Sequence, residues 1–278
     1  MARPRRRRPP DWLVYGGAVL ALTALAIGEQ ERADAPPAPP PMQGLDPALA
    51  PGAAFKAVEV KRAPASGVAA VAGTAFSVSD AGVWVTARHV VSGCSRTAVM
   101  VSQGRGVAAR VVADRSSDLA VLITQGGAPP LPLAPYRALL KGQRGYQPGF
   151  PQGTAGETAT RYLGFDVLRP PGRGARPQTV TAWAEVGRTD GLSGSLAGLS
   201  GAPVLDWRGQ VVGVILAESP RRGRLYSATG EALRAALAAA GQAPSGFARG
   251  ETITTENYGR AADDLRRDLR VAQVVCLE

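Results

Sequence analysis

His89 is the only histidine in the chain, and it lies in an apolar run of strand type between Trp84 and Val91. A single histidine is more often an ordinary core or surface residue than a catalytic one. Two other segments, however, offer partners for a general base: Asp118 opens a short apolar run, and Ser200 lies in a glycine-rich turn. An imidazole held between a carboxylate and a hydroxyl can activate that hydroxyl as a nucleophile. The three residue types therefore predict nucleophilic catalysis by Ser200.

The order of these residues along the chain, His then Asp then Ser, restricts the scaffold. The same catalytic geometry occurs on unrelated folds with different chain orders. An α/β-hydrolase has its histidine after its serine, and no histidine follows Ser200. The G-x-S-x-G turn of that fold is also not formed around Ser200, because position 202 is Ala202. The α/β-hydrolase fold is therefore excluded.

Four sequence signatures occur in a fixed order along the chain. They are GTAFSV with VWVTARHVV (residues 73–78 and 83–91), DLAVL (118–122), GFPQG (149–153) and GLSGAPV (198–204). Together they resemble segments of bacterial trypsin-like and HtrA-like serine peptidases, over roughly residues 68–230. The resemblance implies an all-β fold of two antiparallel six-stranded β-barrels with a C-terminal helix. It also implies a serine endopeptidase without metal or organic cofactor, with His89 and Asp118 on the first barrel and Ser200 on the second.

The resemblance further implies roles for residues around Ser200. The backbone amides of Gly198 and Ser200 would form the oxyanion hole, which stabilises the charge that develops on the substrate carbonyl oxygen. No aspartate stands at the expected base of the primary pocket, so a small or medium apolar substrate side chain is expected rather than lysine or arginine. Five residues on two segments would bind substrate: Gly194, Ser195, Leu216, Ala217 and Glu218.

Two positions near the nucleophile qualify this assignment. Ser193 lies in a similar Gly-Leu-Ser-Gly sequence, but the residues after Ser200 continue like the hairpin of the resembled family, so Ser200 is preferred. Leu199 stands where zymogen-activated members have an aspartate that pairs with a newly cut amino terminus. A leucine forms no such ion pair, and activation by that trimming is therefore not expected. Arg88, beside His89, is expected to face solvent.

The amino-terminal part of the chain has the pattern of an export segment. Residues 1–10 contain five arginines and no acid, and residues 12–28 are almost uncharged. This run is at the short limit for a membrane-spanning helix, which needs about 20 residues. The arginines would keep the amino end in the cytoplasm. We expect residues 11–28 to anchor the protein on the periplasmic side of a bacterial inner membrane. The alternative is a signal peptide, cleaved near Ala24-Leu25-Ala26, and a periplasmic or secreted protein.

The formal net charge of +10 does not indicate nucleic-acid binding. Without the five amino-terminal arginines the charge falls to +5, and the remaining basic residues are spread along the chain. No segment interleaves aromatic and basic residues, as nucleic-acid interfaces commonly do. We therefore expect protein or peptide substrates and no nucleic acid as a partner.

Two cysteines, Cys94 and Cys276, fit an exported protein in which they pair. A disulfide would tie the C-terminal tail to the segment just after His89. Closing so long a loop could stabilise the fold by up to about 5 kcal/mol in the chain-entropy description. The alternative is that the two cysteines are unpaired, buried small hydrophobic residues.

Composition divides the chain into five segments. They are a basic segment (1–10), the anchor or signal peptide (11–28), a proline-rich linker (29–52), the protease domain (53–245) and a C-terminal extension (246–278). Short runs rich in valine, alanine and threonine predict strands rather than βαβ units. These strands are expected at 73–78, 83–87, 97–101, 107–112, 119–124, 162–168, 179–186, 203–206 and 211–216, with the linker between the barrels at 130–135. Helices are expected over 231–240, capped by Thr229, and over 260–270, where alternating charge predicts a solvated face.

Two other functions are compatible with the same sequence. A protease-like module could bind extended peptides or a partner protein without cutting them, but such a module would typically have lost a residue of the triad, and none is lost. A structural envelope protein could also use a β-barrel body. Reaction of Ser200 with a serine-directed reagent would separate these from a peptidase.

Overall fold

The computed structural model describes residues 58–59, 72–114, 116–135, 138–169, 177–243 and 250–277. All of them lie in the second of two compact units, residues 35–278. The expected basic segment, anchor or signal peptide and proline-rich linker lie outside the described residues. Within the described part of the chain, no helix combines the length and apolar character that a membrane span requires.

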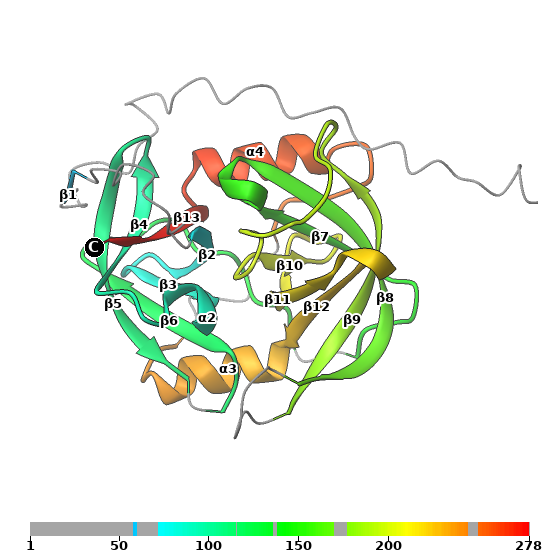
Figure 1. The fold of residues 1–278 in the computed structure, drawn as a ribbon, viewed down its shortest axis with the longest axis horizontal. Helices are drawn as coiled ribbons and strands as arrows, with labels where there is room; N and C mark the ends of the chain where they lie inside the picture. Colours follow the sequence, from blue (N-terminus) through cyan, green and yellow to red (C-terminus); the bar gives the residue numbers. More distant parts are fainter. Residues whose placement is uncertain are drawn as a thin grey trace, which may run out of the picture. The chain divides into compact units, whose positions relative to one another are not determined.

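Two closed β-barrels make up most of the described chain (Figure 1). The strand order of the first barrel is β5-β4-β13-β2-β3-β6, and β5 also pairs with β6, which closes the ring. The short strand β1 (Val58–Glu59) pairs with the start of β5. The strands of the ring are β2 (Ala72–Ser79), β3 (Val83–Ala87), β4 (Arg96–Ser102), β5 (Arg105–Ala113), β6 (Leu119–Thr124) and β13 (Val271–Leu277).

The second barrel closes in the order β10-β11-β12-β9-β8-β7. Neighbouring strands are antiparallel, as in the first barrel. Two six-stranded antiparallel barrels confirm the fold class expected from the sequence. The strands are β7 (Arg144–Gly149), β8 (Gly156–Leu168), β9 (Gln178–Arg188), β10 (Pro203–Leu205), β11 (Val211–Ser219) and β12 (Arg224–Thr229).

The last strand of the chain completes the first barrel, which we did not predict. Strand β13 lies between β2 and β4 and is antiparallel to both, visible as the red strand in Figure 1. We expected residues 246–278 to form an extension, but residues 271–277 are part of the barrel wall. The strand also brings Cys276 to Cys94, and the structure contains the disulfide between them, with Cα atoms 5.2 Å apart.

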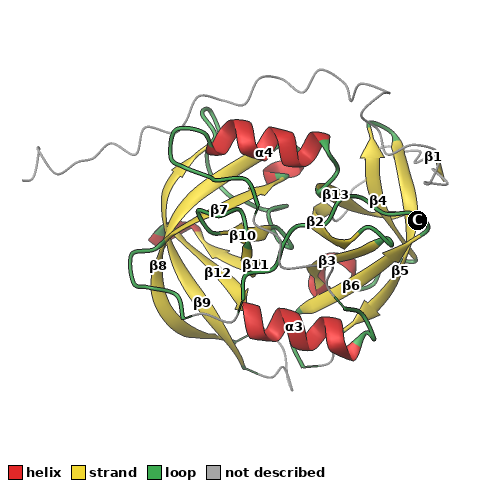
Figure 2. Cartoon of the chain, turned by 180° about the vertical axis from the view of Figure 1, so that it is seen from behind, coloured by secondary structure: helices red, strands yellow, loops and turns green. Residues whose placement is uncertain are grey.

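Two helices of ten residues each contact both barrels from opposite sides (Figure 2). Helix α3 (Gly230–Ala239) packs on β6, β11 and β12, and the Thr229 hydroxyl caps it by accepting a hydrogen bond from the Ala232 amide at 3.1 Å. Helix α4 (Tyr258–Arg267) packs on β7, β8 and β13. The helix predicted over 260–270 is present as α4, but the prediction that its charged residues face solvent is wrong for Arg266. Arg266 is buried, because its guanidinium forms ion pairs with the buried Glu157 and Asp263.

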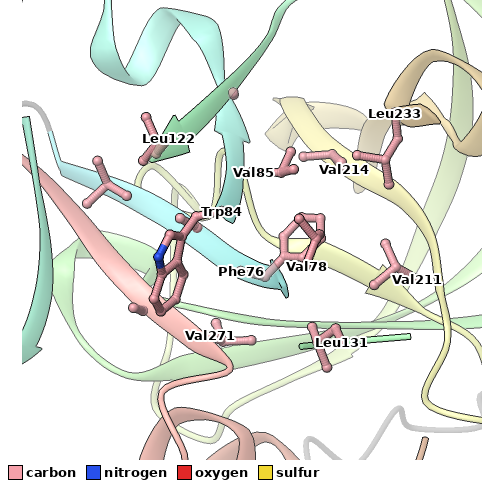
Figure 3. Close-up of a cluster of buried hydrophobic side chains, with 14 of the residues drawn as sticks. Phe76, Val78, Trp84, Val85, Leu122, Leu131, Val211, Val214, Leu233 and Val271 are labelled. Carbon is pink, nitrogen blue, oxygen red and sulfur yellow. The ribbon is translucent and has the colours of Figure 1, made fainter. Parts of the chain in front are cut away.

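The main hydrophobic cluster joins the two barrels (Figure 3). Phe76 and Val85 of the first barrel pack in it with Val214 of β11 and Leu233 of α3. The connection between the barrels runs along this core. Its Leu131 amide donates to the carbonyl of Ser77 in β2, and the carbonyl of Pro132 accepts from the amide of Val211 in β11, both at 2.8 Å. The linker expected at residues 130–135 thus hydrogen-bonds to both barrels.

Candidate active site

His89 and Asp118 meet because of the register of two antiparallel strands. Ala87, the last residue of β3, pairs with Leu119, the first residue of β6. The residues that follow β3 therefore lie opposite Asp118, the residue that precedes β6. There β3 continues into the short helix α2 (Arg88–Val91), which carries His89. The Asp118 carboxylate accepts hydrogen bonds from the His89 amide at 3.0 Å and interacts with His89 Nδ1 at 2.7 Å.

This contact determines which nitrogen of the His89 imidazole can accept a proton. A proton on Nδ1 is shared with the carboxylate, so Nε2 carries the free lone pair. The His89 side chain is 45% exposed, whereas the Asp118 side chain is 16% exposed. The imidazole is thus open to solvent, while the Asp118 carboxylate is largely shielded from water.

Two further residues contact Asp118, and sequence analysis assigned a role to neither. The side-chain oxygen of Gln178, at the start of β9 in the second barrel, accepts from the Asp118 amide at 2.9 Å. Nε of Arg88 lies 3.8 Å from Asp118 Oδ1, and its guanidinium also donates to the carbonyl of Asp114 at 3.1 Å. Arg88, expected to face solvent, is therefore partly engaged with the carboxylate.

The turn that carries Ser200 is docked against the strands that lead to His89. The carbonyl of Ser200 accepts from the amide of Thr74 in β2 at 2.9 Å. The next residue, Gly201, has φ +88°, and a Cβ there would lie 2.0 Å from the carbonyl oxygen of Thr74. A Cβ on Gly73 would lie 2.5 Å from the Val90 side chain and 3.1 Å from the Ser200 carbonyl oxygen. Glycine at both positions lets the two barrels approach closely at this point.

The structure brings Ser200 to the same region as His89 without a direct hydrogen bond. Among the described residues, the side chain of Ser200 makes no hydrogen bond with the imidazole. Catalytic hydrogen bonds are often long or poorly aligned before substrate binds. The structure thus joins two of the three expected catalytic side chains and sets the third on the adjoining turn.

The two amides expected to form the oxyanion hole have no partner within the described chain. The carbonyl of Ala197 accepts from the Gln152 amide at 2.5 Å, and the carbonyl of Leu199 accepts from the Ala202 amide at 2.9 Å. In a trans peptide the N–H points opposite to the C=O, and no described peptide bond is cis. The amides of Gly198 and Ser200 therefore point away from the Gln152 and Ala202 amides that bind the preceding carbonyls.

Two residues of the recognised signatures support this turn. The Thr74 hydroxyl donates to the carbonyl of Gly198 at 2.8 Å and accepts from the amide of Phe150 at 3.1 Å. Gln152, a non-glycine residue with φ 54°, donates through its side-chain amide to the carbonyls of Ser193 and Ser195 at 2.7 and 2.8 Å. Thr74 and Gln152 both lie inside the signatures quoted above, but the sequence analysis assigned neither of them a role.

The expected substrate-binding segments face each other near the Ser200 turn. Glu218 accepts hydrogen bonds from the Ser195 hydroxyl and, at 2.8 Å, from the Leu196 amide. Gly194 is held through its carbonyl by Arg188 at 3.0 Å, while Leu216 is buried. Leu199, expected to form no activating ion pair, is buried in the cluster that contains Trp183. The described residues contain no group of three or more potential metal-ligating side chains.

Comparison with known proteins agrees with this architecture. A family model described as the trypsin-like peptidase domain matches residues 73–214, about half of the chain. The active form of the Rv3671c protease from M. tuberculosis aligns with a TM-score of 0.52 and 23% identity, over 66% of this chain and 76% of that one. An inactive form of the Rv3671c protease aligns with a TM-score of 0.50 and 25% identity, over 60% and 82%. No curated protein matches the sequence.

The matched segment spans the strands and turns that carry His89, Asp118 and Ser200, and it covers strands of both barrels. With the two-barrel topology, this match shows that the chain belongs to the trypsin-like peptidase family and is a chymotrypsin-like serine peptidase.

Proposed function

We propose that this serine peptidase hydrolyses peptide bonds of bacterial envelope proteins, with Ser200 as nucleophile, His89 as general base and Asp118 as the residue that orients the imidazole. The observation that carries the proposal is the 2.7 Å contact between His89 Nδ1 and Asp118. With Nδ1 engaged by the carboxylate, Nε2 is the nitrogen left to accept a proton. Loss of the Asp118 carboxylate would favour the wrong imidazole tautomer.

The proposed reaction proceeds through an acyl-enzyme. Ser200 Oγ attacks the peptide carbonyl carbon while its proton moves to His89 Nε2. The C–N bond then breaks as the imidazolium gives that proton to the leaving amine. A water molecule, deprotonated by His89, attacks the ester carbonyl. The C–O bond to Ser200 breaks, the serine recovers its proton, and the carboxylic product leaves.

The amides of Gly198 and Ser200 support this proposal as oxyanion donors. Charge develops on the carbonyl oxygen in both halves of the reaction, and preorganised N–H groups stabilise it. Both N–H groups lack a protein acceptor in the described residues. Thr74 and Gln152 fix the turn and the segment before it through hydrogen bonds to the carbonyls of Gly198 and Ser193. Removal of one such donor typically costs about 3–4 kcal/mol in the transition state.

We further propose that the peptidase acts on the periplasmic side of the inner membrane, anchored by residues 11–28. The basic-then-apolar order of the amino terminus and the Cys94–Cys276 disulfide support an exported domain. Mass analysis of the mature amino terminus distinguishes anchoring from cleavage. An intact amino terminus in the membrane fraction supports the anchor, whereas a new terminus after residues 24–26 contradicts it.

Reaction with an alkyl fluorophosphonate tests the proposal on the purified chain. The native protein should become labelled, and Ser200→Ala and His89→Ala should lose labelling while keeping the wild-type thermal unfolding transition. Ser193→Ala is the matched control and should label normally. If the folded native protein is not labelled, the proposed nucleophile is wrong, and the chain would instead bind peptides without cutting them.

A further inference from the structure

The segment that precedes the nucleophile, residues 193–197, is fixed from three sides. The Gln152 side chain binds the carbonyls of Ser193 and Ser195 from the turn after β7. Arg188, at the end of β9, binds the carbonyl of Gly194. Glu218, on β11, accepts hydrogen bonds from the Ser195 hydroxyl and the Leu196 amide. These contacts come from three different elements, so the segment cannot move without breaking several hydrogen bonds.

A substrate strand has one free edge to pair with beside Ser200. Strand β11 pairs with β10 only as far as Val214, and the carbonyl and amide of Ile215 bond to Gly201 and Ala202. Beyond Ile215, Leu216 lies at a register shift, and Ala217 and Glu218 pair with β12 on one side. Among the described residues, no strand pairs with residues 216–218 on the other side. An extended peptide added to this edge would present its carbonyl to Ser200. The side chain before the scissile bond would then lie between residues 216–218 and residues 194–197.

The Glu218 side chain crosses that space. One carboxylate oxygen accepts from the Ser195 hydroxyl and the other accepts from the Leu196 amide at 2.8 Å. Both oxygens are therefore used to connect the two walls between which the substrate side chain would enter. The Ser195 hydroxyl also accepts from the Ala197 amide at 3.0 Å, so the bridge and the segment form one network.

Nearby charge makes this carboxylate a poor receptor for a cationic side chain. The Arg188 guanidinium is paired in bidentate fashion with Glu185, and its pKa is raised first by that hydrogen bond and further by the charge of Glu218. Arg188 therefore offsets part of the negative charge that Glu218 would otherwise offer. A lysine or arginine of the substrate would have to compete with these internal donors.

We propose that Glu218 closes the primary pocket and is a specificity-determining residue, so that the enzyme accepts small side chains before the scissile bond and excludes aromatic and basic ones. This inference rests on the proposed function of Ser200. A larger side chain would have to break the bridge to Ser195 and Leu196, and their hydrogen-bonding groups would lose partners. Substrates with alanine or glycine at this position need no such rearrangement.

Peptidyl diphenyl phosphonates that differ only in the side chain next to phosphorus test the proposal. Ser200 Oγ would displace phenoxide from phosphorus, and the inactivation rate reports how well each side chain is accepted. The native enzyme should react about tenfold or more faster with the alanine analogue than with the phenylalanine analogue. In Glu218→Ala the ratio should shift by about tenfold toward phenylalanine, because the bridge is removed.

Glu218→Gln is the matched control. Its amide oxygen can still accept from Leu196 and its NH₂ can donate to the Ser195 hydroxyl, so it should keep the native preference. Equal preferences in native enzyme and Glu218→Ala would overturn the proposal. So would a native preference for the lysine analogue that disappears in Glu218→Ala.

An alkyl fluorophosphonate, which carries no such side chain, distinguishes an error in the pocket assignment from an error in the proposed function. If it labels Ser200 in native enzyme and both variants but the phosphonate preferences do not change, the pocket assignment alone is wrong. If it labels none of the folded proteins, the proposed function fails, and this inference fails with it.

Discussion

The hydroxyl of Thr74 connects the two barrels at the candidate active site. It belongs to β2 of the first barrel, yet it donates to Gly198 in the turn of the second barrel and accepts from Phe150. The Thr74 side chain is fully buried, and its two partners are partly buried. Thr74 is therefore a positioning residue for the Ser200 turn and not itself a catalytic one.

Thr74→Val should reduce both stability and reactivity. The isosteric side chain leaves the partly buried carbonyl of Gly198 and amide of Phe150 without this partner, which costs up to about 1–3 kcal/mol for each group. Displacement of the Gly198 amide should slow labelling by a fluorophosphonate by about tenfold or more. Thr74→Ser keeps the hydroxyl and should retain most of the rate. Equal labelling rates for the two variants would show that the hydroxyl does not position the turn.

At the residue scale, the sequence singled out the three proposed catalytic residues but not the residues that contact them. His89, Asp118 and Ser200 occur in contexts that differ from their surroundings, and the structure joins His89 to Asp118. Gln178 has no such signal, because its contact with the Asp118 amide crosses between barrels over 60 positions of sequence. The Arg88 side chain is 40% exposed, and its contact with Asp118 was not predicted, because only the register of β3 and β6 brings Asp118 opposite it.

At the scale of the elements, the Ser200 turn depends on backbone contacts that no side chain other than hydrogen permits. A Cβ on Gly201 would lie 2.0 Å from the Thr74 carbonyl oxygen and 2.4 Å from the Thr86 hydroxyl. Gly201 also donates its amide to the carbonyl of Ile215 at 2.7 Å. The turn is thus held between β2, β3 and β11, and any widening would separate Ser200 from the region of His89.

Gly201→Ala should abolish labelling or prevent folding, because neither β2 nor the turn can move without breaking these hydrogen bonds. Gly142→Ala is the matched control. Gly142 also has positive φ, +83°, but a Cβ there would meet nothing within 4 Å. The control should therefore lose only about 1–2 kcal/mol from backbone strain and label at the native rate. A Gly201→Ala protein that labels like the native chain would contradict the tight docking.

The strands that were predicted and those that were missed differ in composition. Residues 83–87 and 119–124 were predicted with the observed bounds, because both are short apolar runs rich in valine, leucine and alanine. Strands β7 and β12 were missed. The first contains two glycines and a proline, and the second is largely polar. Strand β13 was missed because its partners lie far earlier in the chain, about 200 positions for β2 and about 175–180 for β4.

At the scale of the whole molecule, the C-terminal segment fastens the two barrels together. The Arg266 guanidinium of helix α4 bonds to Glu157 at 3.0 Å and to the Gly156 carbonyl at 3.1 Å, both in β8 of the second barrel. It also bonds to Asp263 of its own helix at 2.6 Å. The chain then continues into β13 of the first barrel, which the disulfide ties to the residues just after His89. The alternating charge of residues 260–270 thus reflects a buried ionic cluster as well as a solvated face.

Arg266→Leu should strongly destabilise the protein at neutral pH. Burial raises the pKa of Glu157, and Arg266 opposes that rise. Without the guanidinium, a buried carboxylate is left uncompensated, at a cost of about 3–5 kcal/mol. The folded-state pKa of Glu157 should rise further above its unfolded value. The folded protein would then bind a proton more tightly than the unfolded chain, so the destabilisation should shrink as pH falls through the folded-state pKa.

Urea unfolding at pH 5 and pH 8 measures this dependence. The loss for Arg266→Leu should be larger at pH 8 than at pH 5. Arg267→Leu, on the next residue of the same helix, is the control. Its side chain is 44% exposed and pairs with Asp264 at the surface, so its loss should stay below about 1 kcal/mol at both pH values. An equal loss for Arg266→Leu at both pH values would rule out an uncompensated carboxylate.

Peptide mapping of the protein labelled by a fluorophosphonate identifies the nucleophile. We predict one phosphonylated residue, Ser200, with labelling that disappears in His89→Ala and is greatly slowed in Asp118→Asn. Attachment to Ser193 or Ser195 instead, or labelling of Ser200 that is unaffected by loss of His89, would contradict a nucleophile activated by the His89–Asp118 pair.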